Sequence, residues 1–129
     1  MFAVSVSRRP GLAMVVGAAA LVACGVDLGD DVISVRGGDP ERGAELISSF
    51  GCGSCHTIPG IDGAEAVVGP PLTDMGRREY IAGNLPNEPD NMIRWLVDPQ
   101  AVEPGTAMPN LGLSEGEARH VAAYLYTLR

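Results

Sequence analysis

Apolar residues recur at helical spacing in three segments of the chain, residues 39–50, 90–97 and 114–128, which predicts three helices. Two stretches rich in glycine and proline, residues 57–71 and 100–113, predict the loops that connect these helices. Helices and loops together account for most of the chain. We therefore expect an all-α domain of three to four helices.

Residues at the ends of the three segments support these boundaries. Asp39 can cap the first helix, and Pro40 suits its first position, because no amide hydrogen is needed there. Asp90 can cap the second helix in the same way. Ser114 and Glu117 form a capping box, so the last helix is the best marked of the three.

Gly43 lies on the apolar face of the first predicted helix, where a glycine normally weakens a helix. One interpretation is that it lets another helix cross closely, with Val121 and Tyr124 of the last helix as the contacts. The alternative is a tolerated surface glycine.

The amino end carries a different hydrophobic pattern, a continuous apolar run over residues 11–23 that follows Arg8 and Arg9. The run is too short to span a bilayer as a helix but suits the core of a signal peptide. It ends in Leu21-Val22-Ala23-Cys24, which resembles the lipobox of bacterial lipoproteins. We therefore expect a lipoprotein signal peptide over residues 1–23 and lipidation of Cys24. The alternative is ordinary signal cleavage that leaves a free thiol.

Lipidation has a physical consequence, because two or more acyl chains hold a protein stably on a membrane. Residues 24–38 would then be the lipidated cysteine and a flexible tether, and residues 39–129 the folded domain. The alternative for the tether is that it packs on the domain. The expected location is the outer, periplasmic or extracytoplasmic, face of a bacterial membrane.

The net charge of the chain indicates which kinds of macromolecule it can bind. The chain has 129 residues and a formal net charge of −7, and all nine of its basic residues are arginines. A small acidic domain repels phosphate, so we expect no nucleic acid partner. A docking partner should present a basic or apolar face.

The motif with the clearest chemistry is Cys52-Gly53-Ser54-Cys55-His56. Two thiols at this spacing can add to the two vinyl groups of one haem, and the histidine that follows can reach the iron. This predicts covalently bound haem c, with His56 as an axial ligand. The alternatives are a zinc half-site and a redox dithiol. Further zinc ligands would have to come from Cys24 and His120, and we expect His120 to be exposed because it lies off the apolar stripe.

A methionine is expected to supply the second axial ligand. Met108 lies in the loop before the last helix, and prolines at positions 104 and 109 stiffen this loop. A thioether is a soft, neutral donor that favours ferrous haem. Met75 and Met92 compete with it, although Met92 lies in a helix where filling the core is the usual role.

A haem also has two propionates, which need partners when they are enclosed. The planar guanidinium group of arginine suits a carboxylate, so Arg77 or Arg78 is a candidate. Tyr80 and the indole N–H of Trp95 are candidates for the same role. A solvated surface for the arginines and an ordinary core position for the tryptophan are the alternatives.

The order of these features resembles class I cytochrome c over residues 39–129. Three runs resemble the cytochrome c domain fused to subunit II of caa-type cytochrome c oxidases: Ile81-Ala82-Gly83-Asn84-Leu85-Pro86-Asn87, Trp95-Leu96-Val97-Asp98-Pro99-Gln100 and Pro104-Gly105-Thr106-Ala107-Met108-Pro109. The resemblance implies the class I cytochrome c fold, wrapped around one haem. The chain lacks the ligand set of the copper domain in those subunits, which implies a separate haem module.

Gly69-Pro70-Pro71-Leu72 resembles the class I segment in which a proline carbonyl accepts a hydrogen bond from the haem-ligating histidine. The resemblance implies this role for Pro70, with Pro71 as the competitor. A structural turn with no such bond is the alternative.

Together these features predict an electron carrier rather than an enzyme. We expect it to pass single electrons from a quinol-oxidising complex toward a terminal oxidase, with both axial positions of the iron filled. One alternative is a haem enzyme or gas sensor with an open sixth position. The other is a bound haem subunit of a dehydrogenase or oxidase.

Overall fold

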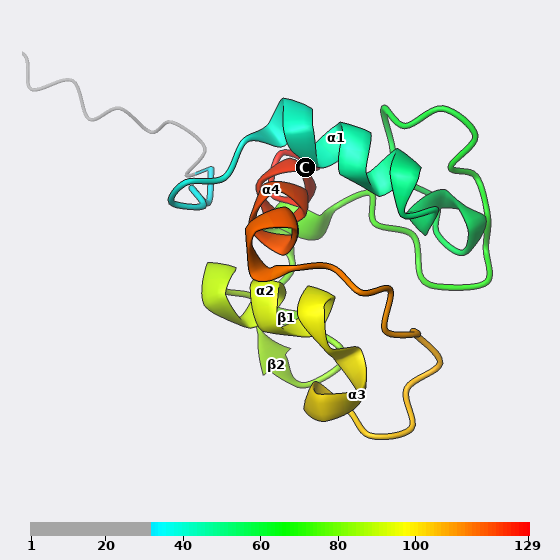
Figure 1. Cartoon of the computed structure of the whole chain (residues 1–129), viewed down its shortest axis with the longest axis vertical. Coiled ribbons are helices and arrows are strands. Elements are labelled where there is room, and N and C mark those ends of the chain that lie inside the picture. The colour runs from blue at the N-terminus through cyan, green and yellow to red at the C-terminus, as the bar shows by residue number, and fades with distance from the viewer. Residues whose placement is uncertain (1–31) are drawn as a thin grey trace, which may run out of the picture.

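The computed structural model describes residues 32–129, which form a helical domain with one small hairpin (Figure 1). The predicted signal peptide and Cys24 lie outside the described residues. The elements in chain order are α1 (Pro40–Ser49), β1 (Tyr80–Ile81), β2 (Leu85–Pro86), α2 (Pro89–Val97), α3 (Pro99–Val102) and α4 (Glu115–Leu125). Within this range, no helix combines the length and the apolar character needed to cross a bilayer.

Local capping sets the ends of α1 and α4. Asp39 caps α1, since its side chain accepts hydrogen bonds from the backbone N–H groups of Glu41 and Arg42. Ser114 and Glu117 form the predicted capping box at the start of α4. Both starting points were therefore predicted correctly from short sequence signals.

α1 and α4 cross at Gly43, and theirs is the most extensive contact between two elements of the described domain. A Cβ atom added to Gly43 would lie 2.1 Å from the carbonyl oxygen of His120 and 2.9 Å from the Cβ of Tyr124. Leu46 and Ile47 of α1 are buried in the same cluster as Val121 of α4. The close approach of the last helix to Gly43 was thus predicted correctly.

The predicted position of His120 was wrong. The side chain is half-buried, and its Nδ1 accepts a hydrogen bond of 3.0 Å from the backbone N–H of Asp39. This contact joins α4 to the first turn of α1. His120 therefore has a structural partner that the periodicity of its own helix could not reveal.

The middle of the chain differs from the prediction in two helices. α2 begins at Pro89, one residue before the predicted cap Asp90, because the proline takes the first position of the helix. α3 lies inside a predicted loop, and the Asp98 side chain caps it by accepting from the N–H of Ala101. This Asp-Pro start repeats the signal that marks α1.

The hairpin is also absent from the sequence prediction. β1 and β2 pair in antiparallel register, with Ile81 opposite Leu85. The turn between them requires positive φ angles at Ala82 (+50°) and Gly83 (+85°). Strands of two residues are too short to show alternation, so only the turn glycine marked this element.

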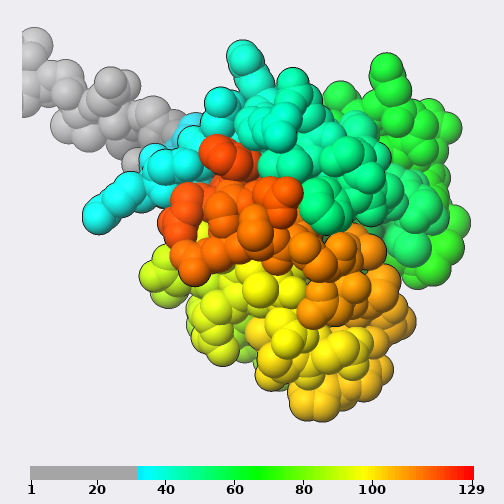
Figure 2. Space-filling view, viewed as in Figure 1, coloured from blue at the N-terminus to red at the C-terminus, as the bar shows by residue number. Residues whose placement is uncertain are grey.

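The end of the predicted tether is packed on the domain. Val35 is 7% exposed and belongs to the core cluster, and the carbonyl of Arg36 accepts a hydrogen bond of 3.4 Å from Arg119 of α4. Gly38 passes so close to α4 that an added Cβ would lie 2.7 Å from the Cβ of Ala123. In the space-filling view this cyan segment lies against the orange-red last helix (Figure 2). The prediction of a flexible tether over residues 24–38 was therefore wrong for residues 32–38.

A buried polar contact joins the middle of the chain to its carboxyl end. Asn87 is 8% exposed, and its side-chain amide donates to the carbonyls of Met75 and Arg78, both at 2.8 Å. Its Oδ1 accepts from the hydroxyl of Tyr126 at 3.0 Å. Burial raises the pKa of the Tyr126 phenol, so this hydroxyl remains a donor. These bonds satisfy the buried side chains of Asn87 and Tyr126 and fix the chain near Met75.

Candidate functional site

The end of α1 delivers the Cys52–His56 motif. Gly51 follows the helix with φ +71°, and Cys52–Ser54 then forms a single 3₁₀ turn. The carbonyl of Cys52 accepts from the backbone N–H groups of Cys55 and His56, at 3.2 Å and 3.1 Å. The turn thereby brings both thiols to the wall of one cavity.

His56 is oriented by the segment predicted to hold it. Its Nδ1 lies 2.7 Å from the carbonyl oxygen of Pro70, whereas the carbonyl of Pro71 accepts from Arg78. A carbonyl only accepts, so Nδ1 carries the hydrogen and Nε2 keeps its lone pair. This arrangement leaves Nε2 as the ring nitrogen that can coordinate a metal.

Gly69 fits against the imidazole ring of His56. A Cβ atom added here would lie 2.5 Å from Cε1 and 2.8 Å from Nδ1 of the ring. The N–H of Gly69 donates to the carbonyl of Cys55 at 2.7 Å, which fixes the backbone at this distance. The sequence showed the two prolines of this segment, but it did not show the need for a glycine.

We expect Gly69→Ala to weaken ligation by His56 about tenfold or more, because the methyl group forces the ring or the loop to move and such overpacking costs about 1–3 kcal/mol. The measurement is the fraction of purified holoprotein in the low-spin form during a titration with a competing ligand. Val67→Ala is the control, since that exposed side chain lies in the same loop and does not line the cavity. Equal titration curves for the two variants would contradict the role of Gly69.

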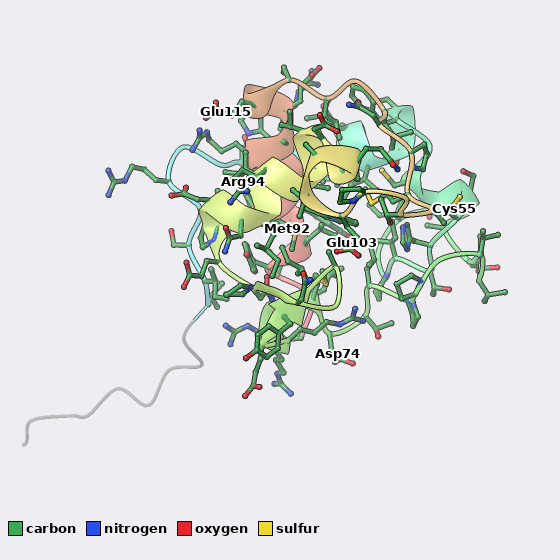
Figure 3. All side chains as sticks on the ribbon, turned by 90° about the horizontal axis from the view of Figure 1, so that it is seen from below. Cys55, Asp74, Met92, Arg94, Glu103 and Glu115 are labelled. Atoms are coloured by element: carbon green, nitrogen blue, oxygen red, sulfur yellow. The ribbon has the colours of Figure 1, made fainter. Side chains whose placement is uncertain are left out.

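The cavity has a volume of about 450 Å³ and a mainly apolar lining. Its walls come from α1, the Cys52–His56 turn, the hairpin and the segment that leads to it, α2, α4 and the loop before α4. In Figure 3, Met92 of α2 lies near the centre of the molecule and Cys55 near its edge. Arg78 and Glu103 are the charged residues among those that line it. Such a cavity suits a large, mostly apolar group with a small polar portion.

The four candidates for binding propionates do not all reach the cavity. Arg78, Tyr80 and Trp95 line it, whereas Arg77 is exposed and does not. Arg78 is half-buried, and Tyr80 is 55% exposed. Of the two arginines offered as candidates, Arg78 is therefore the one that lines the cavity.

All three candidate methionines line the cavity, but their surroundings differ. Met92 is fully buried and Met75 is 6% exposed, and both belong to the hydrophobic core. Met108 is half-buried and packs against the edge of this core from the loop before α4. Met108 is therefore the least buried of the three methionines and contributes least to the packing of the core.

The alternatives of zinc and redox chemistry find no support in the geometry. Within residues 32–129, no group of three His, Cys, Asp or Glu side chains is arranged to hold a metal ion. Burial raises the pKa of the Cys52 thiol, and the neighbouring Cys55 adds to this. A reactive dithiol would need a lowered thiol pKa.

Comparison with known proteins agrees with this geometry. The family model for cytochrome c matches residues 40–129. The chain belongs to the cytochrome c family. Covalently bound haem c is therefore its cofactor, and the family indicates an electron carrier. The mainly apolar cavity, with two thiols and an oriented imidazole on its walls, fits this group.

The related proteins include cytochrome c oxidase subunit 2 of Alkalihalophilus pseudofirmus, 35% identical over 89 residues, which cover 68% of this chain and 25% of that protein. The subunit of the same name from Bacillus subtilis is 33% identical over 93 residues, which cover 69% and 26%. The chain thus spans about a quarter of the length of the curated relatives it matches. The predicted resemblance to oxidase subunit II is confirmed.

Among solved structures, cytochrome c2 from Rhodobacter sphaeroides superposes with a TM-score of 0.55. The match covers 70% of this chain and 96% of that protein, with 22% sequence identity. At 22% sequence identity the structural similarity supports a shared fold and nothing beyond it. The predicted class I cytochrome c fold is thereby confirmed.

Proposed function

We propose that this protein is a membrane-anchored monohaem cytochrome c that carries single electrons in a bacterial respiratory chain, toward a terminal oxidase. The observation that carries the proposal is the convergence of Cys52, Cys55, His56 and Met108 on one mainly apolar cavity. Bound haem would supply an iron centre that takes up and gives up one electron at a time.

The residues of the cavity have separable roles in this proposal. Cys52 and Cys55 would hold the haem through two thioether bonds, and Nε2 of His56 would bind its iron. The carbonyl of Pro70 holds the ring by its 2.7 Å bond to Nδ1 and increases the basicity of the imidazole. Met108 offers its thioether from a separate loop.

The polar lining of the cavity would meet the propionates. Arg78 is the basic residue of the lining, and it already donates to the carbonyl of Pro71, so its position is fixed near the histidine segment. The hydroxyl of Tyr80 and the indole N–H of Trp95 are the other donors proposed for this role.

Electrons would enter and leave where the cavity meets the surface. Val68 and Tyr80 line the cavity and are 81% and 55% exposed, and the neighbouring Val67 is 87% exposed. Exposed apolar side chains around a redox site favour a partner with an apolar contact face. This patch and the acidic charge of the chain support docking on an apolar or basic face of a terminal oxidase.

The proposed anchor is a lipid on Cys24, at the outer face of the membrane. The lipobox-like end of the apolar run supports it, and the relatives named as oxidase subunits support a respiratory partner. Residues 32–38 pack on the domain, so seven residues, 25–31, separate the proposed anchor from the part of the chain that the structure describes. Seven residues extend at most about 23–25 Å, which keeps the domain close to the membrane.

The experiment that tests the function uses the full chain, matured with the machinery for haem attachment and lipoprotein export. We expect one haem and one lipid-modified Cys24 by intact mass, and oxidation of the reduced protein by membranes that contain a terminal oxidase. Cys24→Ser should shift more than about nine-tenths of the protein to the soluble fraction, since the acyl chains provide the membrane affinity.

Cys52→Ser serves as the control that removes one thioether bond without changing the anchor. A colourless product, or a haem protein that the oxidase membranes leave reduced, would contradict the proposed function. If the Cys24→Ser variant is coloured and active but stays on the membrane, the lipid anchor alone is contradicted.

A second candidate function is that of a bound subunit in an oxidase complex. The names of the relatives favour it, because their cytochrome c region is part of an oxidase subunit. Purification in mild detergent separates the two candidates. A free carrier elutes alone, whereas a bound subunit elutes with the other chains of the complex.

A further inference from the structure

The side-chain amide of Gln100 connects α3 to the loop that carries Met108. Its Nε2 donates to the carbonyl of Thr106 at 2.8 Å and to the carbonyl of Met108 at 3.1 Å. Its Oε1 accepts from the N–H of Gly105 at 3.2 Å. Two carbonyls and one N–H group are compatible with only one orientation of the amide, so the assignment of nitrogen and oxygen follows from the partners.

The loop has few other bonds to the rest of the molecule. The N–H of Thr106 donates to the carbonyl of Glu103 at 3.1 Å, and the N–H of Met108 donates to the Thr106 hydroxyl at 3.4 Å. Both bonds stay within residues 103–109. In the part of the chain that the structure describes, the other hydrogen bonds that tie residues 104–109 to the rest of the chain all involve the side chain of Gln100.

The first turn of α3, which carries Gln100, is held in place by its neighbours. Gln100 lies in the first turn of α3, directly after Pro99, which is fully buried. The Asp98 side chain caps the same turn by its 3.2 Å bond from the N–H of Ala101. A side chain fixed at this position can hold the loop in one place, even though Gln100 itself is exposed.

We propose that Gln100 is a positioning residue that keeps the thioether of Met108 at the wall of the cavity. This inference rests on the proposed function, in which Met108 fills the sixth position of the haem iron. A loop with one dominant arrangement presents the thioether most of the time. A loop that samples several arrangements gives competing ligands access to the site, because apparent affinity follows the fraction of competent molecules.

The test compares holoprotein variants by the ferric charge-transfer band of a thioether ligand and by titration with imidazole, which competes for the sixth position. We expect Gln100→Ala to keep the band but to bind imidazole about tenfold more tightly than the unchanged protein, as expected for the loss of one to two net hydrogen bonds. Gln100→Glu keeps the acceptor for Gly105 but has no N–H, and it should shift affinity in the same direction. Alanine is a good helix former, so α3 itself is not weakened.

Asn91→Ala is the matched control, because Asn91 of α2 also donates its amide to a backbone carbonyl, that of Pro86 at 3.0 Å, outside the Met108 loop. The unfolding midpoint of each variant separates a local effect from a global one. If both Gln100 variants bind imidazole within about twofold of the control, the inference is wrong. If the unchanged protein has no thioether band, or Met108→Leu retains it, the proposed ligand is wrong and the inference fails with it.

Discussion

Gly43→Ala is expected to destabilise the domain by at least about 3 kcal/mol, the upper end of the usual cost of overpacking a core. The added methyl group would lie 2.1 Å from the carbonyl oxygen and 2.8 Å from the carbonyl carbon of His120, which are backbone atoms of α4. A flexible side chain could turn away, but a helix backbone moves only as a unit. α1 and α4 must therefore separate, and the cavity that both helices border must open.

Gly116→Ala is the matched control for this experiment. Gly116 also lies in a helix, but an added Cβ meets nothing within 4 Å. Alanine there should stabilise the protein by roughly 0.5–1 kcal/mol through helix propensity alone. The measurement is chemical unfolding of the holoprotein, followed by circular dichroism. Equal free energies of unfolding for the two variants would mean that the close approach of α4 to Gly43 does not contribute to stability.

The parts of the fold that were predicted from the sequence are those that local chemistry determines. A capping side chain acts within four residues, so Asp39 and Ser114 mark the starts of α1 and α4 without knowledge of the rest of the molecule. The spacing of Cys52, Cys55 and His56 is equally local. The Asp98-Pro99 start of α3 is a local signal of the same kind.

The features that the sequence did not reveal depend on contacts between distant segments. The need for glycine at position 69 arises from the ring of His56, which is brought there by a different turn. The half-buried state of His120 arises from a bond to Asp39, 81 positions away. The packing of residues 32–38 likewise needs the surface of α4, which a reading of that segment alone cannot supply.

The choice among the three methionines combines local and distant information. Each of them lines the cavity, so position alone does not select the ligand. Met75 and Met92 fill the core, where a thioether acts as an ordinary apolar side chain. Met108 is half-buried on a loop whose backbone makes three hydrogen bonds with the side chain of Gln100, two donated by Gln100 and one accepted by it. Met108 lies at the cavity wall without being part of the buried core, so it is a better candidate for a bond to iron than Met75 or Met92.

Met108→Leu is therefore expected to remove thioether ligation while the fold is retained. Leucine has a similar volume and no sulfur, so the loss of stability from packing should be less than about 1.5 kcal/mol. The ferric charge-transfer band of the thioether should disappear. The reduction potential should fall by on the order of 0.1 V or more, within the roughly 0.8 V range that axial ligands span, because a thioether favours the ferrous state.

The matched controls for Met108→Leu are Met75→Leu and Met92→Leu, which make the same chemical change on the same cavity. Both should keep the band and shift the potential much less, since their side chains act as core residues. A variant at position 75 or 92 that alone loses the band would transfer the ligand role to that methionine. A high-spin ferric spectrum in the unchanged protein would instead favour an open sixth position, and the protein would then be able to bind a small ligand rather than only pass electrons.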